Sequence, residues 1–127
     1  MIKEIIIIMF VFIIILAICI ISAWYINSTA AKITSILAPI EMSINKDDWQ
    51  RAKQTYSSAM EQWDKQRNIW KILVNHEELK DIEVGFIEVG TLLDQQNADE
   101  TKKELTTLIF YLEHVPETEK LDLSNLF

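Results

Sequence analysis

Two histidines and several clustered carboxylates are the side chains of this chain best suited to catalysis or metal binding. His76-Glu77-Glu78-Leu79-Lys80 begins like the zinc-protease motif His-Glu-x-x-His, whose two histidines bind the metal from one helix face. Lys80 stands where the second histidine would be, and the other histidine, His114, lies 38 residues after His76. We expect both histidines to terminate helices, where a donor or a cation near free carbonyl groups is favourable.

A second group of possible ligands is acidic. Asp94, Asn97, Asp99 and Glu100 lie close together, but a calcium loop also needs a central glycine, and this stretch has none. Asn97 or Asp99 is expected to cap a helix instead. No Ser or Cys lies beside a base in a nucleophile motif. The sequence therefore predicts no catalytic residue, no metal site and no cofactor, and we expect a protein that is not an enzyme.

Four aromatic residues recur every seven positions, at Trp49, Tyr56, Trp63 and Trp70. This spacing drifts only ~20° per step on a straight helix, so the rings form one stripe. An exposed stripe would be a platform for a glycan or peptide, and a buried one would fill the seam between helices. We expect a buried stripe, with Trp70 as the member that faces the surface.

Composition excludes several protein classes. The chain has 127 residues, a formal net charge of -7 and one cysteine, which allows no internal disulfide. An acidic balance argues against sequence-independent nucleic-acid binding, which needs basic residues on phosphates. Residues 28–76 hold seven basic and five acidic side chains, and residues 77–127 hold four basic and 13 acidic ones. We expect the two halves to pack together, rather than to leave an acidic face for a cation or basic partner.

The N-terminal segment has the character of a membrane span. Ile5 to Ile26 is a run of 22 residues without a charge, and as a helix it would span roughly 33 Å, enough for a hydrocarbon core of ~30 Å. Trp24 and Tyr25 end the run with rings that favour the headgroup layer. A cleaved signal peptide usually has an apolar region of only ~7–15 residues, although small residues near Ser28 to Ala31 would permit cleavage. We expect a retained anchor in the lipid bilayer.

Charge flanking the anchor predicts its orientation. Lys3 and the α-amino group precede the run, whereas no positive charge follows it until Lys32. The positive-inside rule then places the N-terminus in the cytoplasm and residues 28–127 outside. The expected location is the cell membrane, with a single pass.

Beyond the anchor the apolar residues recur at steps of three and four, which places them on one helix face. No segment alternates for long enough to predict a strand. The expected helices lie near residues 28–44, 47–75, 77–96 and 99–115, the first continuing from the membrane span. Pro39 should kink or shorten the first helix, and Pro116 should stop the last. The short joints favour antiparallel neighbours.

The sequence therefore predicts an all-α protein, in which an N-terminal transmembrane helix precedes a small antiparallel bundle of about four helices, counting the one next to the membrane. The expected divisions are an anchor at 1–27, a bundle at 28–115 and a tail at 116–127. Gly85 and Gly90 fall within a helix, where each costs ~1 kcal/mol relative to alanine. A ring or helix packed closely against them is the expected compensation.

Several motifs resemble those of one family. They are the membrane span, the start Asp48-Trp49-x-x-Ala52, the pair Trp63 and Trp70, His76-Glu77-Glu78, and the ending from Leu112 to Phe127. Over nearly its whole length the chain resembles domain of unknown function 4363, a family of small single-pass membrane proteins of Gram-positive, often spore-forming bacteria. The resemblance implies an anchored helical domain and an accessory role beside small multi-pass membrane proteins. It implies no functional residue.

We expect a non-enzymatic accessory subunit that binds a membrane protein outside the cell. The expected contacts are Trp70 and the apolar tail residues Leu123, Leu126 and Phe127, although the tail would otherwise fold back over the bundle. The alternative is an extracytoplasmic ligand-binding or sensor domain that uses the aromatic stripe or the acidic face. The oligomeric state stays open.

Overall fold

The protein folds as helices throughout the part of the chain that the structure describes. The computed structural model describes residues 1–126, with side chains as far as residue 117. The helices are α1 (Ile2–Leu37), α2 (Ile40–Asn45), α3 (Trp49–Leu73), α4 (His76–Asp94) and α5 (Ala98–Leu126). No strand occurs among these residues, so the predicted all-α fold is confirmed.

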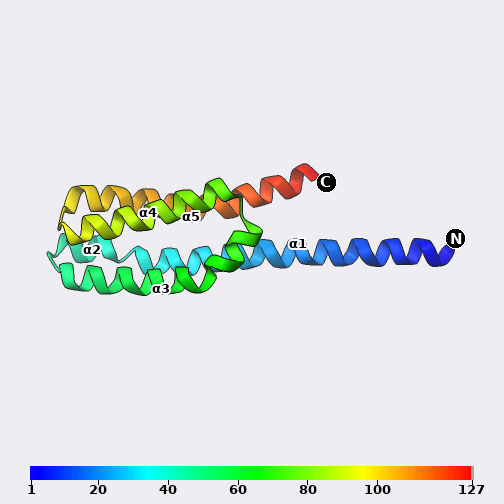
Figure 1. Ribbon diagram of the computed structural model, residues 1–127, viewed down its shortest axis with the longest axis horizontal. Coiled ribbons are helices and arrows are strands. Elements are labelled where there is room, and N and C mark those ends of the chain that lie inside the picture. Colours follow the sequence, from blue (N-terminus) through cyan, green and yellow to red (C-terminus); the bar gives the residue numbers. More distant parts are fainter. Residues whose placement is uncertain (127) are drawn as a thin grey trace.

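α1 is a single helix with two different environments (Figure 1). Its first half projects from the bundle, and Ile8 and Ile15 there are 68% and 53% exposed. This half is long and apolar enough to cross a membrane. Its second half packs inside the bundle, with buried side chains at Ile26, Ala30, Ile33 and Leu37. The helix that follows the apolar run therefore continues from it without a break, as predicted.

Pro39 ends this long helix. α1 stops at Leu37, and Pro39 stands at the N-cap position of the short helix α2. Proline has no N–H and clashes with the turn before it, so the α1 ladder of hydrogen bonds cannot pass this point. α2 then continues roughly in line with α1, and the two together form one side of the bundle (Figure 1).

Side-chain caps begin the next three helices. Asp48 accepts a hydrogen bond from the N–H of Arg51 at 3.1 Å, which caps α3. Asn75 accepts one from the N–H of Glu77 at 2.8 Å, and Asn97 accepts one from the N–H of Glu100 at 3.3 Å. Such caps satisfy N–H groups that have no partner inside the helix and stabilise it by about 1 kcal/mol each. The polar joints in the sequence are thus helix starts.

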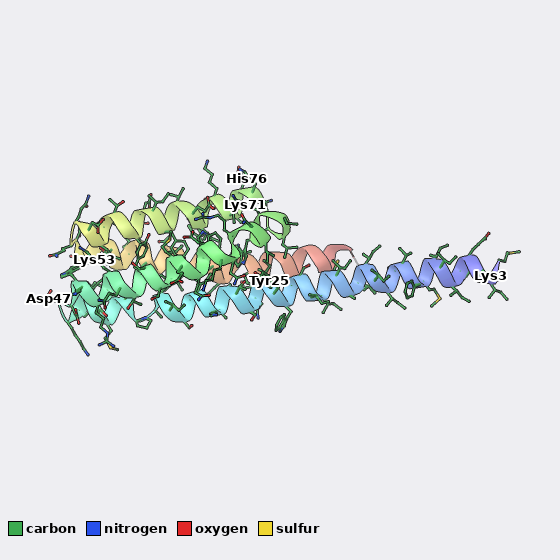
Figure 2. The ribbon with its side chains drawn as sticks, turned by 60° about the horizontal axis from the view of Figure 1, so that its bottom comes forward. Lys3, Tyr25, Asp47, Lys53, Lys71 and His76 are labelled. Atoms are coloured by element: carbon green, nitrogen blue, oxygen red, sulfur yellow. The ribbon has the colours of Figure 1, made fainter. Side chains whose placement is uncertain are left out.

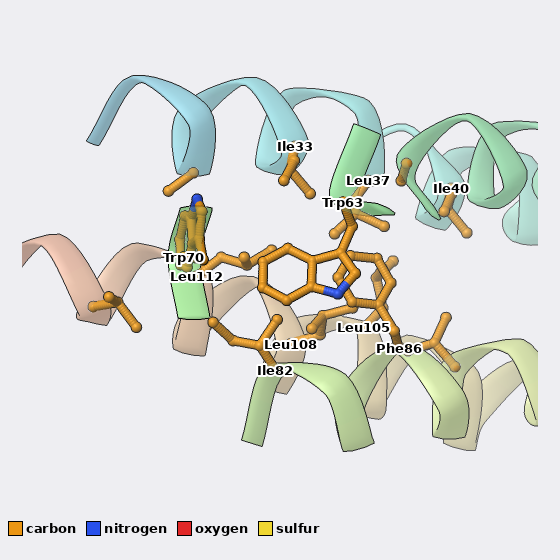
Figure 3. Packing of buried hydrophobic residues seen from close by; sticks show 14 of the residues in the cluster. Ile33, Leu37, Ile40, Trp63, Trp70, Ile82, Phe86, Leu105, Leu108 and Leu112 are labelled. Carbon is orange, nitrogen blue, oxygen red and sulfur yellow. The ribbon is translucent and has the colours of Figure 1, made fainter. Parts of the chain in front are cut away.

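The core is one apolar seam shared by all the helices. It contains the buried side chains at the predicted three- and four-residue steps, among them Trp63, Phe86, Leu108 and Leu112. Trp63 lies in its middle, between α1 above and α4 and α5 below (Figure 3). The Trp63 and Phe86 rings stack with centroids 5.7 Å apart. Burial of these large side chains in one shared cluster holds the bundle together.

The prediction that Pro116 stops the last helix is wrong. α5 runs through Pro116 as far as Leu126 and extends past the bundle, on the side of the projecting half of α1 (Figure 1). Proline in a helix interior removes one hydrogen bond, here the one to the Leu112 carbonyl, but its φ remains helical. Leu112 and Val115 are 0% and 2% exposed, so burial of this turn holds the helix together across the proline.

Candidate functional site

The aromatic stripe lies in the core. Trp63 and Trp70 are each 0% exposed, and Trp49 and Tyr56 pack partly buried against the same cluster. The rings of Trp63 and Trp70 meet edge to face with centroids 5.3 Å apart, an arrangement that aromatic pairs favour. The predicted burial is confirmed, and the stripe offers no open platform for a glycan or peptide.

The expectation that Trp70 faces the surface is wrong. Its side chain is fully buried, and its indole N–H donates a hydrogen bond to Oγ1 of Thr29 at 2.9 Å. The Thr29 hydroxyl in turn donates to the carbonyl of Tyr25 at 2.8 Å. α1 continues beside the end of α3 and covers the Trp70 ring. Trp70 is therefore the point at which the end of α3 is fixed to α1.

Tyr56 makes a second long-range bond within the bundle. Its hydroxyl donates to the carbonyl oxygen of Phe86 on α4 at 2.6 Å. Burial, and after it the negative charges of Asp94 and Asp64, raises the pKa of Tyr56, so the hydroxyl keeps the proton that it donates. A bond between helices at this position sets the register of α3 against α4.

The two glycines of α4 make room for neighbours, as predicted. A Cβ added at Gly90 would lie 2.6 Å from the hydroxyl oxygen of Tyr56. A Cβ added at Gly85 would lie 2.9 Å from the Cδ1 methyl of Leu108 on α5. The ring against Gly90 is held in place by its hydrogen bond, whereas the methyl against Gly85 is the end of a flexible side chain. Glycine is thus required more strictly at position 90 than at position 85.

The two histidines lie on different helices. His76 is the first residue of α4 rather than a C-terminal one, and His114 lies inside α5, so the prediction that they terminate helices is wrong for both. The His114 ring stacks on Phe110 at 5.5 Å. Within the described residues, no group of three or more His, Cys, Asp and Glu side chains is placed to hold a metal ion.

Opposite charges join the basic and acidic halves of the chain, as expected. Arg67 of α3 pairs with Glu83 of α4 at 3.0 Å, and Lys53 pairs with Asp94 at 3.8 Å. Both pairs are partly or largely exposed, so each contributes no more than about 1 kcal/mol.

One acidic contact between α4 and α5 was missed in the sequence. A side-chain hydrogen bond with Glu88 is the main cause that raises the pKa of Glu104, ahead of burial and of repulsion by the Glu88 charge. The two carboxyls lie along a shallow groove of about 320 Å³, which Ile87 and Leu92 also line. They lie 16 positions apart on different helices, so only the packing of α4 on α5 brings them together.

Exposed isoleucines near the joint between α3 and α4 were also missed. Ile72 is 82% exposed and Ile69 is 43% exposed. In the sequence they belong to the run Ile69-Trp70-Lys71-Ile72-Leu73-Val74, whose buried face periodicity alone does not identify. The remaining predicted contacts, Leu123, Leu126 and Phe127, lie outside the described side chains, although α5 includes the first two.

Comparison with known proteins places the chain in a family. A family model described as a domain of unknown function matches residues 20–126, from within the apolar run to the end of α5. No curated protein and no solved structure matches the chain. The match covers the whole bundle, as the motifs Asp48-Trp49 and Trp63 with Trp70 predicted. The chain therefore belongs to the DUF4363 family, whose domain has no known function.

Proposed function

We propose that this protein is a non-enzymatic accessory subunit, anchored in the cell membrane by α1, whose bundle binds a neighbouring membrane protein outside the cytoplasm. The observation that carries the proposal is the continuity of α1. One unbroken helix is apolar and exposed around Ile15, and then supplies core residues such as Ile33 to the bundle. A helix of this kind holds its domain directly on the bilayer, without a flexible linker.

The contacts of α1 support an anchor that is retained rather than a signal peptide that is removed. Cleavage among the small residues Ser28 to Ala31 would remove Ile26, which is 1% exposed in the core, and Thr29 would be lost or left at a chain end. The Trp70 N–H would lose its partner in that position. A buried N–H without a partner costs about 1–3 kcal/mol. Loss of these contacts would destabilise the bundle, which supports a retained α1.

We place the contact with the partner on the end of α5. α5 continues through Leu126 and extends past the bundle, on the side of the projecting half of α1 (Figure 1). A partner that spans the same membrane would meet this end first, and Leu123, Leu126 and Phe127 supply the apolar side chains in the sequence. Helix-on-helix contact through such residues is a common mode of recognition.

The orientation in this proposal follows the positive-inside rule. Lys3 and the α-amino group lie before the apolar run, and the first basic residue after it is Lys32. The bundle then lies outside the cytoplasm. Fusion of a reporter after Phe127 that is active only on one side of the membrane would determine the side directly.

Site-specific photocrosslinking tests the proposed partner. A photoreactive residue at Leu126 should link the protein in native membranes to one membrane protein, and the same residue at exposed Gln54 on α3 should not. Deletion of residues 117–127 keeps buried Val115 and Pro116, so it should abolish copurification of that protein while the bundle stays folded. An equal crosslink from both positions, or copurification unchanged by the deletion, would refute the proposed contact.

A further inference from the structure

We define the α3–α4 corner as residues 68–76. Its exposed apolar side chains lie at an unusual position in the fold. Ile72 is 82% exposed and Ile69 is 43% exposed, whereas Trp70 between them is completely buried in the core. A single exposed isoleucine on a protein surface needs no explanation. The position of these two along α1 is what distinguishes them.

The hydrogen bond between Trp70 and Thr29 fixes the level of the corner along α1. α3 runs toward the projecting half of α1, so Ile72, two residues after Trp70, lies ~3 Å further in that direction. Thr29 lies three residues after Ile26, the last residue of the apolar run, which is ~4.5 Å along the helix. Ile72 therefore lies within a turn of the level at which the apolar run ends.

Two views of the molecule agree with this level. The joint between α3 and α4 lies where α1 emerges from the bundle (Figure 1), and Lys71 and His76 lie at nearly the same place along the long axis as Tyr25 (Figure 2). Both figures keep the long axis horizontal, so the position along it can be compared between them.

A bilayer on the apolar run would bring its headgroup layer to the corner. The layer is about 5–7 Å thick on each side of a hydrocarbon core of ~30 Å. Trp24, 67% exposed, and Tyr25 mark the same level on α1 with rings that favour this layer. Isoleucine side chains at this level gain by leaving water for the boundary of the acyl chains, because burial of apolar surface is favourable.

Charge around the corner is mixed rather than basic. Lys71 is exposed there, and α4 begins with His76, Glu77 and Glu78. Net attraction to anionic lipid is therefore not the source of binding. The Lys71 stem can lie along the apolar surface with its ammonium group among the lipid phosphates. Insertion of the isoleucines would be the dominant contribution to a membrane contact here.

We infer that the α3–α4 corner is a second membrane contact, in which Ile72 and Ile69 lie in the headgroup layer of the bilayer that α1 spans. The inference rests on the membrane anchoring proposed above. Two attachments, α1 and the corner, fix the tilt of the bundle. Its far end, with the joints that follow Asn45 and Asp94, then points away from the bilayer (Figure 1).

Depth-resolved fluorescence quenching of the full chain tests the inference. In a Cys19→Ala background, the fluorophore NBD is attached to a single cysteine in each of three variants: Ile72→Cys, Ile87→Cys and Ile14→Cys. Ile87 is the matched control, because it is an isoleucine 66% exposed on α4, and it lies 11 residues from His76, or ~16 Å along the helix. The protein is reconstituted into phosphatidylcholine vesicles with nitroxide groups on the lipid headgroups or deep in the acyl chains.

The predicted result has three parts. The label at residue 14 is quenched most by deep nitroxides, and the label at residue 72 is blue-shifted relative to residue 87 and quenched most by headgroup nitroxides. The label at residue 87 keeps its aqueous emission and is not quenched. Circular dichroism should show equal helicity in all three variants, because each replaces an exposed side chain.

Two different failures can be told apart. If residue 14 is deeply quenched but residue 72 behaves like residue 87, the corner does not touch the membrane and only the present inference is overturned. If residue 14 is not quenched by any lipid, α1 does not span the bilayer, and the anchor proposed above is overturned together with the inference.

Discussion

Trp70 and Thr29 lie 41 positions apart, and the indole N–H of Trp70 donates a hydrogen bond to the Thr29 hydroxyl oxygen at 2.9 Å. The bond joins the last turn of α3 to the part of α1 that emerges from the bundle (Figure 1). It links the helix that carries the apolar run to the end of α3, and it sets the level of the α3–α4 corner along α1. Its removal should therefore affect both stability and the position of the corner.

Thr29→Val should destabilise the protein by about 1–3 kcal/mol, because valine has the shape of threonine but leaves the buried Trp70 N–H unpaired. Chemical unfolding in mild detergent, followed by tryptophan fluorescence, measures the change. Ser35→Ala is the matched control, since it removes an exposed hydroxyl from the same helix that bonds only to the Lys32 carbonyl. Equal midpoints for the two variants would contradict the role given to the bond.

Gly90→Ala should destabilise the bundle by about 1 kcal/mol. The added Cβ displaces the Tyr56 hydroxyl and its bond to the Phe86 carbonyl, worth about 1–3 kcal/mol. Alanine recovers ~1 kcal/mol of helix propensity. Thermal unfolding of both glycine variants gives the comparison: Gly85→Ala should cost less, because only the end of Leu108 must move.

A double-mutant cycle isolates the tyrosine contact. In a Tyr56→Phe background the hydroxyl oxygen is absent, so Gly90→Ala should cost less than it does in the natural sequence. If the cost is the same in both backgrounds, the ring is not what requires glycine at this position.

Pro116→Ala should stabilise the protein by about 1.5 kcal/mol. α5 continues through this position, and alanine restores the N–H that can bond to the Leu112 carbonyl. The substitution also removes the proline penalty, which is ~3 kcal/mol in a helix interior. Loss of the buried ring methylenes offsets roughly half of this gain. A rise in the melting temperature, measured by circular dichroism, is the expected outcome, and a fall would show that the ring contributes more than the hydrogen bond.

Acidification should stabilise the contact between α4 and α5. The pKa of Glu104 is raised in the folded state, mainly by its hydrogen bond with Glu88, so the folded protein binds this proton more tightly than the unfolded chain. This contribution to stability is fully present below the pKa that Glu104 has in the unfolded chain. It is lost as the pH rises through the higher pKa that Glu104 has in the folded protein. Unfolding midpoints between pH 4 and 7 should therefore vary less for Glu104→Gln than for the natural protein. A steeper variation in the variant would contradict the assignment.

The fold was largely predictable because its signals are local. The uncharged run Ile5 to Ile26 identifies the helix that is long and apolar enough to cross a membrane, and Asp48 and Asn97 mark helix starts. The steps of three and four select the core. Pro116 was mispredicted because burial of Leu112 and Val115 outweighs the local cost of proline, and the sequence does not show that burial.

The surface features depended on how the helices pack. The period of seven places Trp70 in the aromatic stripe, but it does not show that α1 reaches far enough to cover it. Glu88 and Glu104 meet only because α4 and α5 adopt one register. The exposure of Ile72 likewise follows from which neighbour covers each side of α3. These features depend on contacts between helices, which the periodicity along one helix does not predict.

Thiol labelling in intact cells tests the central claim most directly, namely that α1 spans the membrane and continues into an exterior bundle. A membrane-impermeant maleimide should label Ala31→Cys in a Cys19→Ala background, since Ala31 is exposed on α1 just beyond the apolar run. Native Cys19, within the run, should stay unlabelled, and Lys3→Cys in that background should be labelled only after lysis. Labelling of Cys19 as fast as that of residue 31 would show that α1 does not lie in a bilayer.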